Sequence, residues 1–449
     1  MMRLCSATLA AYRRYAGLAL LMSSALVPVA TTVAAVSDPV QPLAESFAAL
    51  ALQLGRIPGH EREVDSWFGP RPAVPAPAPR DAAALAADAQ ALLVRIKREQ
   101  ARAPTGRGAR LLVQSGSFAA LADDLAQPHK QTFAQEAAAV YATTVPAVDR
   151  GAMRRDLQQL SALLPGEGDV NSRLEDYREK FVVPQRRRRA VFERALRACR
   201  ERTLAHWKLP AGEKVDVEWD DSVPAAWHSY QGHAHSTLRI NPAAVALVGQ
   251  ALDVACHEAY PGHHSQFLLL EQHAGPAGPA VEDSVALLHS PAQVLREGAA
   301  NFGVDLAFPL AERIAFDRQV LFPLAGLDPA RAQRYEKINV LVNDLAVAAV
   351  PIIAAYRDGH LSFNDAAIAL QTDALIESAP ALLQFVDQEG ALTLGYTAAR
   401  DMVRDHVRAQ VACTGQDPWA VLAEMVAEPA VGVLSAAVMP CGPHAGRTN

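Results

Sequence analysis

The chain has 449 residues, of which 50% are hydrophobic, 20% are charged and 6% are aromatic. This composition supports a large apolar core and excludes a disordered or collagen-like chain. The formal net charge is -6, whereas a nucleic-acid-binding protein needs a basic face to neutralise phosphates. We therefore expect no nucleic-acid partner. The basic run from Arg186 to Arg189 is interpreted as the solvated end of an amphipathic helix.

The N-terminus has the pattern of a Sec-type signal peptide. Arg3, Arg13 and Arg14 form a positively charged region, and no charged residue follows between positions 16 and 36. Small residues fit cleavage after Ala35, which would release a periplasmic or secreted protein. An uncleaved segment would instead anchor the chain, and this is the only membrane contact that we expect.

The remaining chain divides into three parts in this interpretation. Residues 36–80 are an N-terminal segment with a proline-rich spacer, because the alternating prolines between Gly69 and Pro79 favour extended polyproline. Residues 81–212 form a helical N-terminal half, and residues 213–449 form a half that carries a zinc site. The expected helices of the N-terminal half lie near residues 81–104, 129–143, 149–164 and 172–207, the last opened by a capping box at Ser172 and interrupted at Pro184.

The pattern changes between Glu213 and Ile240, where a small β-sheet is expected. Val215, Val217 and Trp219 alternate with acidic residues, and residues 236–240 are a second strand candidate. His233 and His235 could face a metal from that strand, or they could be ordinary residues of a solvated edge that binds an extended peptide.

From Asn241 onward the pattern is helical again, so the predicted fold class is mainly α with one small sheet. The expected helices lie near residues 242–260, 263–273, 291–307, 330–357, 364–378 and 397–412.

Four cysteines remain once the signal segment is removed. In an oxidising compartment two of them could pair, and Cys413 with Cys441 is the nearest choice along the chain. The alternative is that neither is paired. Cys256 lies in an apolar helix and is expected to be a small buried hydrophobic residue.

The most informative stretch runs from His257 to Gln266. It begins as the zinc-binding motif H-E-x-x-H, in which two histidines one helical turn apart bind zinc and the glutamate is a general base. The spacing differs, however, because His263 follows His257 by six residues. On a regular helix His263 would point about 120° away from His257, and His264 would lie about 10 Å further along the axis.

Pro261-Gly262 offers a solution to this spacing. Proline cannot donate the next helical hydrogen bond, and glycine tolerates the conformations that a bulge requires. If these two residues bulge out of the helix, His263 takes the place of the second zinc-binding histidine. His264 would then turn elsewhere, towards substrate or towards the groups that support the ligands.

A third ligand is available 40 residues after His257. Ser290 to Gln293 form a capping box that opens a helix carrying Glu297, which we predict as the third ligand. Small residues at 298–300 allow close helix packing, and Asn301 could hydrogen-bond a zinc-bound imidazole. Two histidines and one carboxylate would leave the fourth position of a zinc ion (Zn2+) open, as in catalytic sites.

These residues resemble a bacterial family of exported metallopeptidases, catalogued as domain of unknown function 885, in the gluzincin-like clan. The resemblance rests on His257-Glu258-x-x-Pro261-Gly262-His263-His264-x-Gln266 followed by Glu297-Gly298. It implies a mostly helical fold, zinc and peptidase activity. It also implies His257, His263 and Glu297 as ligands and Glu258 as the catalytic acid and base. The chain departs from the family at Ala299, where an aromatic residue is usual, and lacks a Pro-Gly-Gln segment near its C-terminus.

We therefore predict zinc-dependent hydrolysis of peptide bonds, with Glu258 as general base towards a metal-activated water. Tyr396 and Arg400, one turn apart on an expected helix, could stabilise an oxyanion or could be structural residues. Two alternatives are a zinc hydrolase of another amide or ester and a catalytically inactive periplasmic binding protein. The sequence does not indicate peptide length, side-chain specificity or oligomeric state.

Overall fold

The computed structural model describes residues 38–69, 81–128, 131–223 and 225–428. The predicted signal peptide, the prolines of the spacer and Cys441 lie outside these ranges, so export and the Cys413–Cys441 pairing stay predictions. The chain from Pro39 onward forms one compact unit. This unit includes both the N-terminal helices and the part that carries the predicted zinc site.

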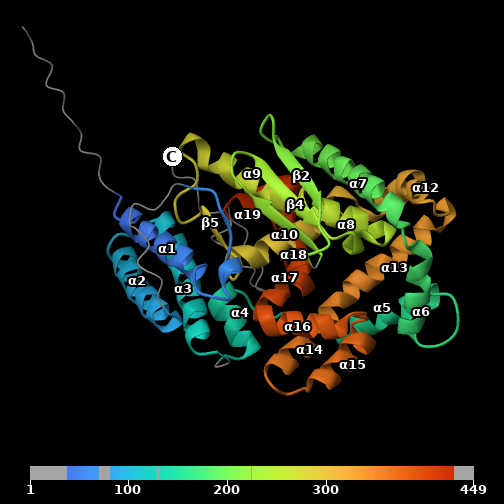
Figure 1. Ribbon diagram of the computed structural model, residues 1–449, viewed down its shortest axis with the longest axis horizontal. Helices are drawn as coiled ribbons and strands as arrows, with labels where there is room; N and C mark the ends of the chain where they lie inside the picture. The colour runs from blue at the N-terminus through green and yellow to red at the C-terminus, as the bar shows by residue number, and fades with distance from the viewer. Residues whose placement is uncertain (1–37, 70–80, 129–130, 224, 429–449) are drawn as a thin grey trace, which may run out of the picture. The chain divides into compact units, whose positions relative to one another are not determined.

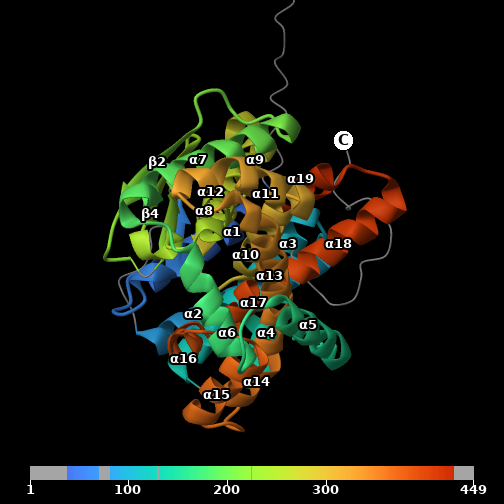
Figure 2. The ribbon, with the colours of Figure 1, turned by 90° about the vertical axis from the view of Figure 1, so that its right-hand side faces the viewer.

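The unit is mainly helical, as predicted (Figures 1 and 2). In its N-terminal part Asp81, Thr105, Thr132 and Asp149 cap helices through their side chains, as these residue types do at helix starts. Asp169 rather than Ser172 caps the start of the fourth predicted segment, 172–207, so the capping box predicted at Ser172 is wrong. The helices are α1 Gln41–Leu54, α2 Ala82–Arg102, α3 Gly106–Ala126, α4 Phe133–Tyr141, α5 Arg150–Leu163, α6 Val170–Arg178 and α7 Gln185–His206.

The C-terminal part surrounds one central helix, α10, whose residues are almost all buried. Helices α8, α17, α18 and α19 pack against it. The predicted helix 242–260 is shorter than expected, because residues 242–245 form a 3-10 turn before α8 begins. The helices are α8 Val248–Glu258, α9 His263–Ala274, α10 Pro291–Ala307, α11 Leu310–Phe316, α12 Phe322–Ala325, α13 Ala332–Leu345, α14 Ala349–Arg357, α15 Phe363–Asp373, α16 Ala379–Glu389, α17 Leu394–Thr397, α18 Ala399–Thr414 and α19 Pro418–Ala427.

The predicted small sheet is present and has three strands, β2 Lys214–Trp219, β3 Ala226–Tyr230 and β4 His235–Ile240. The strand order is β2-β4-β3, with β2 and β4 parallel and β3 antiparallel to β4. Strand β4 is therefore central, and the expectation that it offers a free edge is wrong. His233 lies in the turn before β4, with φ 54°, while His235 pairs with Asp216 at 2.9 Å. These two histidines do not face a common metal ion.

A second, two-stranded sheet was not predicted. It pairs β1 Val64–Trp67 with β5 Val285–Leu287 in antiparallel register, and a bulge lies between Val64 and Ser66. We call residues 61–67 the strap. Arg62 in the strap lies over the Trp227 ring at 4.7 Å and pairs with Glu389 at 3.8 Å. The strap therefore joins the three-stranded sheet to the end of α16.

A buried histidine fixes the strap to two helices. His289, just before α10, contacts Glu63 of the strap through Nδ1 at 2.6 Å and Glu389 at the end of α16 through Nε2 at 3.2 Å. Burial alone would lower the pKa of His289, but hydrogen bonding to Glu389 and Glu63 outweighs burial and raises this pKa to about 9. At neutral pH an imidazolium thus connects two carboxylates from distant segments.

Helices α7 and α8 are joined by a disulfide between Cys199 and Cys256. Both cysteines are fully buried. The prediction that Cys256 is an unpaired buried residue is therefore wrong. The two residues are 57 positions apart, so local spacing gave no sign of the pair. The disulfide lies directly beside His257 in the chain.

One helical run, residues 329–357, is long and apolar enough to cross a membrane by length and composition. In this structure its two main helices, α13 and α14, pack against α5, α11 and α16. Glu336 within the run is buried and pairs with Arg313 at 2.5 Å. A core helix of a compact protein has the same composition, so the run supports no conclusion about a membrane.

The disulfide generates a first prediction. Replacing both cysteines, in the variant Cys199→Ala/Cys256→Ala, should lower the free energy of unfolding by about 4 kcal/mol, because a long loop of the unfolded chain is no longer closed. Urea unfolding of the oxidised protein and the variant measures the difference. Equal stability of the two samples would contradict the prediction.

The buried imidazolium generates a second prediction. Because its folded-state pKa is raised, His289 stabilises the fold fully below its unfolded pKa of about 6.5, and the contribution disappears as pH rises through about 9. The contribution of His289 to the free energy of unfolding is roughly 3 kcal/mol, calculated from the difference between its folded and unfolded pKa. His289→Gln should lower the melting temperature at pH 6 much more than at pH 10. An equal loss at both pH values would show that His289 acts only through packing.

Candidate metal centre

The two predicted histidine ligands are brought together by a break between two helices. Helix α8 ends at Glu258 and α9 begins at His263, and the Tyr260–Pro261 peptide bond between them is cis. The Gly262 amide donates to the Cys256 carbonyl oxygen at 3.0 Å. The predicted bulge within one helix is therefore a junction of two helices. The two histidines still come together as expected, because the centroids of the His257 and His263 rings are 4.8 Å apart.

Only glycine fits at position 262. A Cβ atom built there would lie 1.6 Å from the His257 carbonyl oxygen, which no side chain could tolerate. Glycine at position 262 is therefore required for the imidazoles of His257 and His263 to lie this close together.

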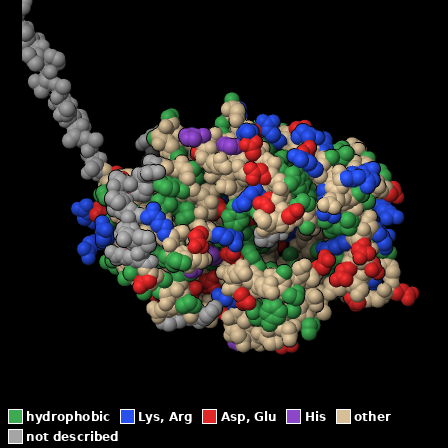
Figure 3. Space-filling view, viewed as in Figure 1, with side chains coloured by type: hydrophobic (Ala, Val, Ile, Leu, Met, Phe, Trp, Pro, Cys, Tyr) green, Lys and Arg blue, Asp and Glu red, His purple; other side chains and the backbone are tan. Residues whose placement is uncertain are grey.

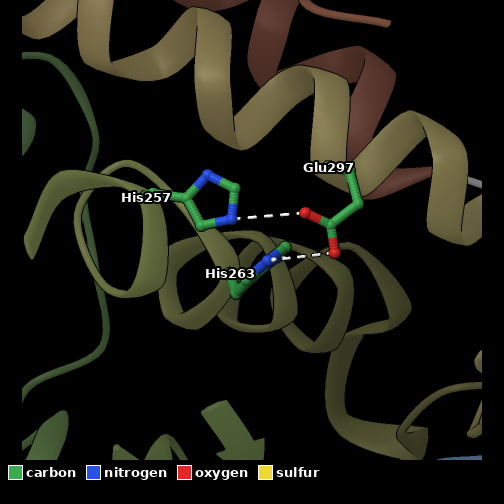
Figure 4. Close-up of side chains that lie close together, drawn as sticks. All are labelled: His257, His263 and Glu297. Atoms are coloured by element: carbon green, nitrogen blue, oxygen red, sulfur yellow. Dashed lines mark ion pairs between the residues drawn. The ribbon is translucent and has the colours of Figure 1, made fainter. Parts of the chain in front are cut away.

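Glu297 on α10 completes a cluster of three possible ligands (Figure 4). Its Oε2 lies 3.2 Å from His257 Nε2, and its Oε1 lies 3.6 Å from His263 Nε2. Three donors around one tetrahedral zinc ion would be separated by about 3.3 Å. In addition, Glu297 Oε2 is buried without a hydrogen-bond partner among the described residues. The donor set therefore fits one divalent metal ion such as zinc. Of the three side chains, His257 is the most exposed, at 16%.

Two amides hold the ligands in place. Asn301 Oδ1 lies 3.0 Å from His257 Nδ1, which is the supporting position predicted for Asn301. Gln293 Nε2 donates to Glu297 Oε1 at 2.8 Å. The predicted capping box is thus only half formed. Ser290 Oγ caps the backbone of Gln293, but the Gln293 side chain turns to the ligand instead of the helix start.

The charges of the three residues favour one another. Burial alone would raise the pKa of Glu297, but the nearby imidazoles of His263 and His257 lower it below its usual range. Burial alone would lower the pKa of His257, but the ion pair with Glu297 and the negative charge of Glu258 raise it to about 9. Without a metal, His257 therefore holds a proton that a metal ion must displace.

Glu258 and Tyr396 border the cluster. Glu258 is half-buried, and burial raises its pKa against the opposing charges of His257 and His263. A raised pKa makes a carboxylate a stronger proton acceptor than an ordinary glutamate. Tyr396 on α17 donates from its hydroxyl to Glu297 Oε1 at 3.2 Å, and 44% of Tyr396 is exposed. Its hydroxyl therefore contacts the cluster, while another part of the residue faces solvent.

Two other predicted residues lie elsewhere. His264 is fully buried and contacts Ser236 Oγ at 2.7 Å and Glu213 Oε2 at 3.0 Å, so it connects α9 to the sheet and does not face a substrate. Arg400 pairs with Asp344 and Asp401, both at 2.9 Å. Tyr396 and Arg400 do not share one regular helix as expected, because α17 ends at Thr397 and α18 begins at Ala399.

Three residues near the cluster were missed. His228 on β3 is buried, stacks on Phe267, and its ring lies 5.8 Å from that of His263. Asp65 lies in the bulge of β1, and Arg296 precedes Glu297 on α10. No local motif marks them. Arg296 directly precedes Glu297, a predicted ligand, and this is the one sequence feature that could have suggested that Arg296 lies near the site.

We compared the chain with family models, curated proteins and solved structures, and found no match. The resemblance noted from the motif therefore rests on the motif residues themselves.

The geometry of the cluster generates a third prediction. Purified protein should bind about one zinc ion, and His257→Ala, His263→Ala and Glu297→Ala should each lose most of it, because two ligands cannot hold zinc tightly. Metal analysis after dialysis, with circular dichroism to confirm folding, measures this. The control is His360→Ala, which removes an exposed histidine. Full zinc content in any of the three ligand variants would remove that residue from the site.

Proposed function

We propose that this protein is an exported zinc metallopeptidase that hydrolyses peptide bonds. The observation that carries the proposal is the junction of α8 and α9, which directs His257 and His263 at Glu297 while Glu258 stays beside them. Two histidines and a carboxylate are the ligand set of catalytic zinc sites with an open position. The motif residues further support a place in the domain of unknown function 885 family and a gluzincin-like fold.

When bound, zinc would polarise an amide carbonyl and lower the pKa of a water molecule towards ~7. The groups of the protein account for the other steps. Glu258 accepts the proton of the attacking water and passes it to the leaving amine. We assign to Tyr396 the hydrogen bond to the oxyanion that develops on the carbonyl oxygen, for which its hydroxyl would turn its one proton away from Glu297 Oε1. Asn301 and Gln293 keep the ligands oriented through both steps.

The signal-like N-terminus supports a periplasmic or secreted location. The buried disulfide agrees with this location, because structural disulfides persist in oxidising compartments. A catalytically inactive binding protein is the weaker interpretation. Such a protein would have no need for a half-buried glutamate with a raised pKa beside the ligands.

Glu258 generates the fourth prediction. Glu258→Gln keeps the size of the side chain but removes the proton acceptor, so turnover of peptides should fall at least ~100-fold. Zinc content and melting temperature should not change. Glu312→Gln, which alters an exposed glutamate, is the matched control and should keep full activity.

The assay uses a mixed peptide library and a set of small esters, with cleavage followed by mass spectrometry. Near-normal peptide hydrolysis by zinc-loaded Glu258→Gln would show that another group activates the water. Hydrolysis of esters without hydrolysis of peptides by the wild-type protein would favour a different zinc hydrolase.

A further inference from the structure

We infer that the rings of Tyr396 and Phe385 bind a large apolar side chain of the substrate, on a residue that flanks the cleaved bond. We call these two rings the aromatic wall. This inference rests on the proposed function and names its side-chain preference. The argument has three parts, which are the contact of Tyr396 with the cluster, the open aromatic surface, and the pairing of the charges around it.

Tyr396 lies directly against the metal centre. Its hydroxyl is 3.2 Å from Glu297 Oε1, and that oxygen is 3.6 Å from His263 Nε2. The residue before it, Gly395, lies so close that an added Cβ atom would be 3.0 Å from Glu297 Cβ. Helix α17 therefore packs on the ligand itself, and the Tyr396 ring, which is bonded to the hydroxyl oxygen, lies beside the cluster.

The aromatic wall continues from Tyr396 to α16. The Phe385 ring lies edge to face with that of Tyr396, with the ring centroids 5.5 Å apart and an angle of 73° between the planes. This geometry is favoured for two aromatic rings, so the two side chains hold each other in place. Phe385 is half-buried and Tyr396 is exposed. An aromatic surface thus stays open next to the cluster.

The molecule is hollowed beside this surface. Figure 3 shows a hollow near the middle of the face seen in Figure 1, next to the position of α17. Adjacent residues of an extended peptide are about 3.3–3.6 Å apart. When the attacked carbonyl lies at the metal centre, the residues on the two sides of the cleaved bond are therefore the ones whose side chains can reach the aromatic wall.

The charged groups on the helices of the aromatic wall and just after them are paired with one another. Glu389 at the end of α16 pairs with Arg62 at 3.8 Å. Arg400 in the first turn of α18 pairs with Asp344 and with Asp401, both at 2.9 Å. A charged substrate side chain would lose water against the two rings without gaining one of these groups as a partner. An apolar side chain gains from the same contact because it leaves water.

The test uses matched peptides that differ at one residue beside the cleaved bond, which is phenylalanine, leucine, alanine, lysine or glutamate. On one side of the bond, kcat/KM of the wild-type protein should be at least ~10-fold higher for phenylalanine or leucine than for the other three, as apolar pockets discriminate by size. Phe385→Ala should remove most of this preference, keep its zinc content and cleave the alanine peptide as the wild type does. Phe385→Leu should retain most of the preference, because it keeps an apolar surface.

The matched control is Phe363→Ala, which should behave as wild type. Phe363 is also half-buried and also lies edge to face with a tyrosine, Tyr356, at 6.1 Å. The Tyr356 hydroxyl, however, donates to Asp387 and not to a ligand of the cluster.

Tyr396→Phe separates the role of the ring from that of the hydroxyl. This variant keeps the ring but removes the group assigned to the oxyanion. It should therefore lower kcat for all peptides alike and leave the preference for apolar residues unchanged.

Binding gives a second measurement that does not depend on turnover. In the inactive Glu258→Gln background, calorimetry should show tighter binding of the phenylalanine peptide than of the alanine peptide, and Phe385→Ala should remove this difference. Equal cleavage of all peptides, a preference for lysine or glutamate, or an equal loss on the phenylalanine and alanine peptides in Phe385→Ala would overturn the inference and leave the peptidase proposal standing. No hydrolysis of any peptide by zinc-loaded protein would overturn the peptidase proposal and this inference with it.

Discussion

The arrangement of the site depends on one steric constraint, the path of the backbone at Gly262. A regular helix through this region would turn the imidazoles of His257 and His263 about 120° apart. The chain instead folds so closely on itself that a Cβ atom at Gly262 would overlap the carbonyl of His257. Because the two rings then meet, the buried carboxylate of Glu297 has both imidazoles within 3.6 Å. Without them, its burial would cost several kcal/mol.

The two adjacent histidines of α9 show how the site is fixed in the fold. Neighbouring residues on a helix point about 100° apart, so His263 faces the metal centre while His264 faces the sheet. Glu213, which accepts from His264, also binds Tyr260 and Arg200. These bonds outweigh its burial and lower its pKa to about 2. The first turn of α9 is therefore held from one side by a buried ionic network and from the other by the ligands.

The sequence predicted those features that depend on local chemistry. The cap at Ser290, the break at Pro184 and the mainly helical class follow from residue types at short spacing, and they agree with the structure. The cluster of His257, His263 and Glu297 was also predicted, because the motif and the later glutamate are recognisable by themselves. The pairing of Cys199 with Cys256, the sheet of β1 and β5, and the position of Asp65 could not be predicted. They depend on contacts between segments far apart in the sequence, which no local pattern reports.

Cys256 is both the neighbour of His257 and the partner of Cys199, so the covalent state of the chain and the geometry of the ligands are linked. Both sulfur atoms are sealed in the core, and no oxidant can reach them once the protein has folded. The cross-link must therefore form while α7 and α8 are still assembling. In a chain that folds in a reducing compartment, His257 would lie on a helix α8 that no disulfide joins to α7. Assembly of the His257, His263 and Glu297 cluster is thus a matter of where and when the chain folds.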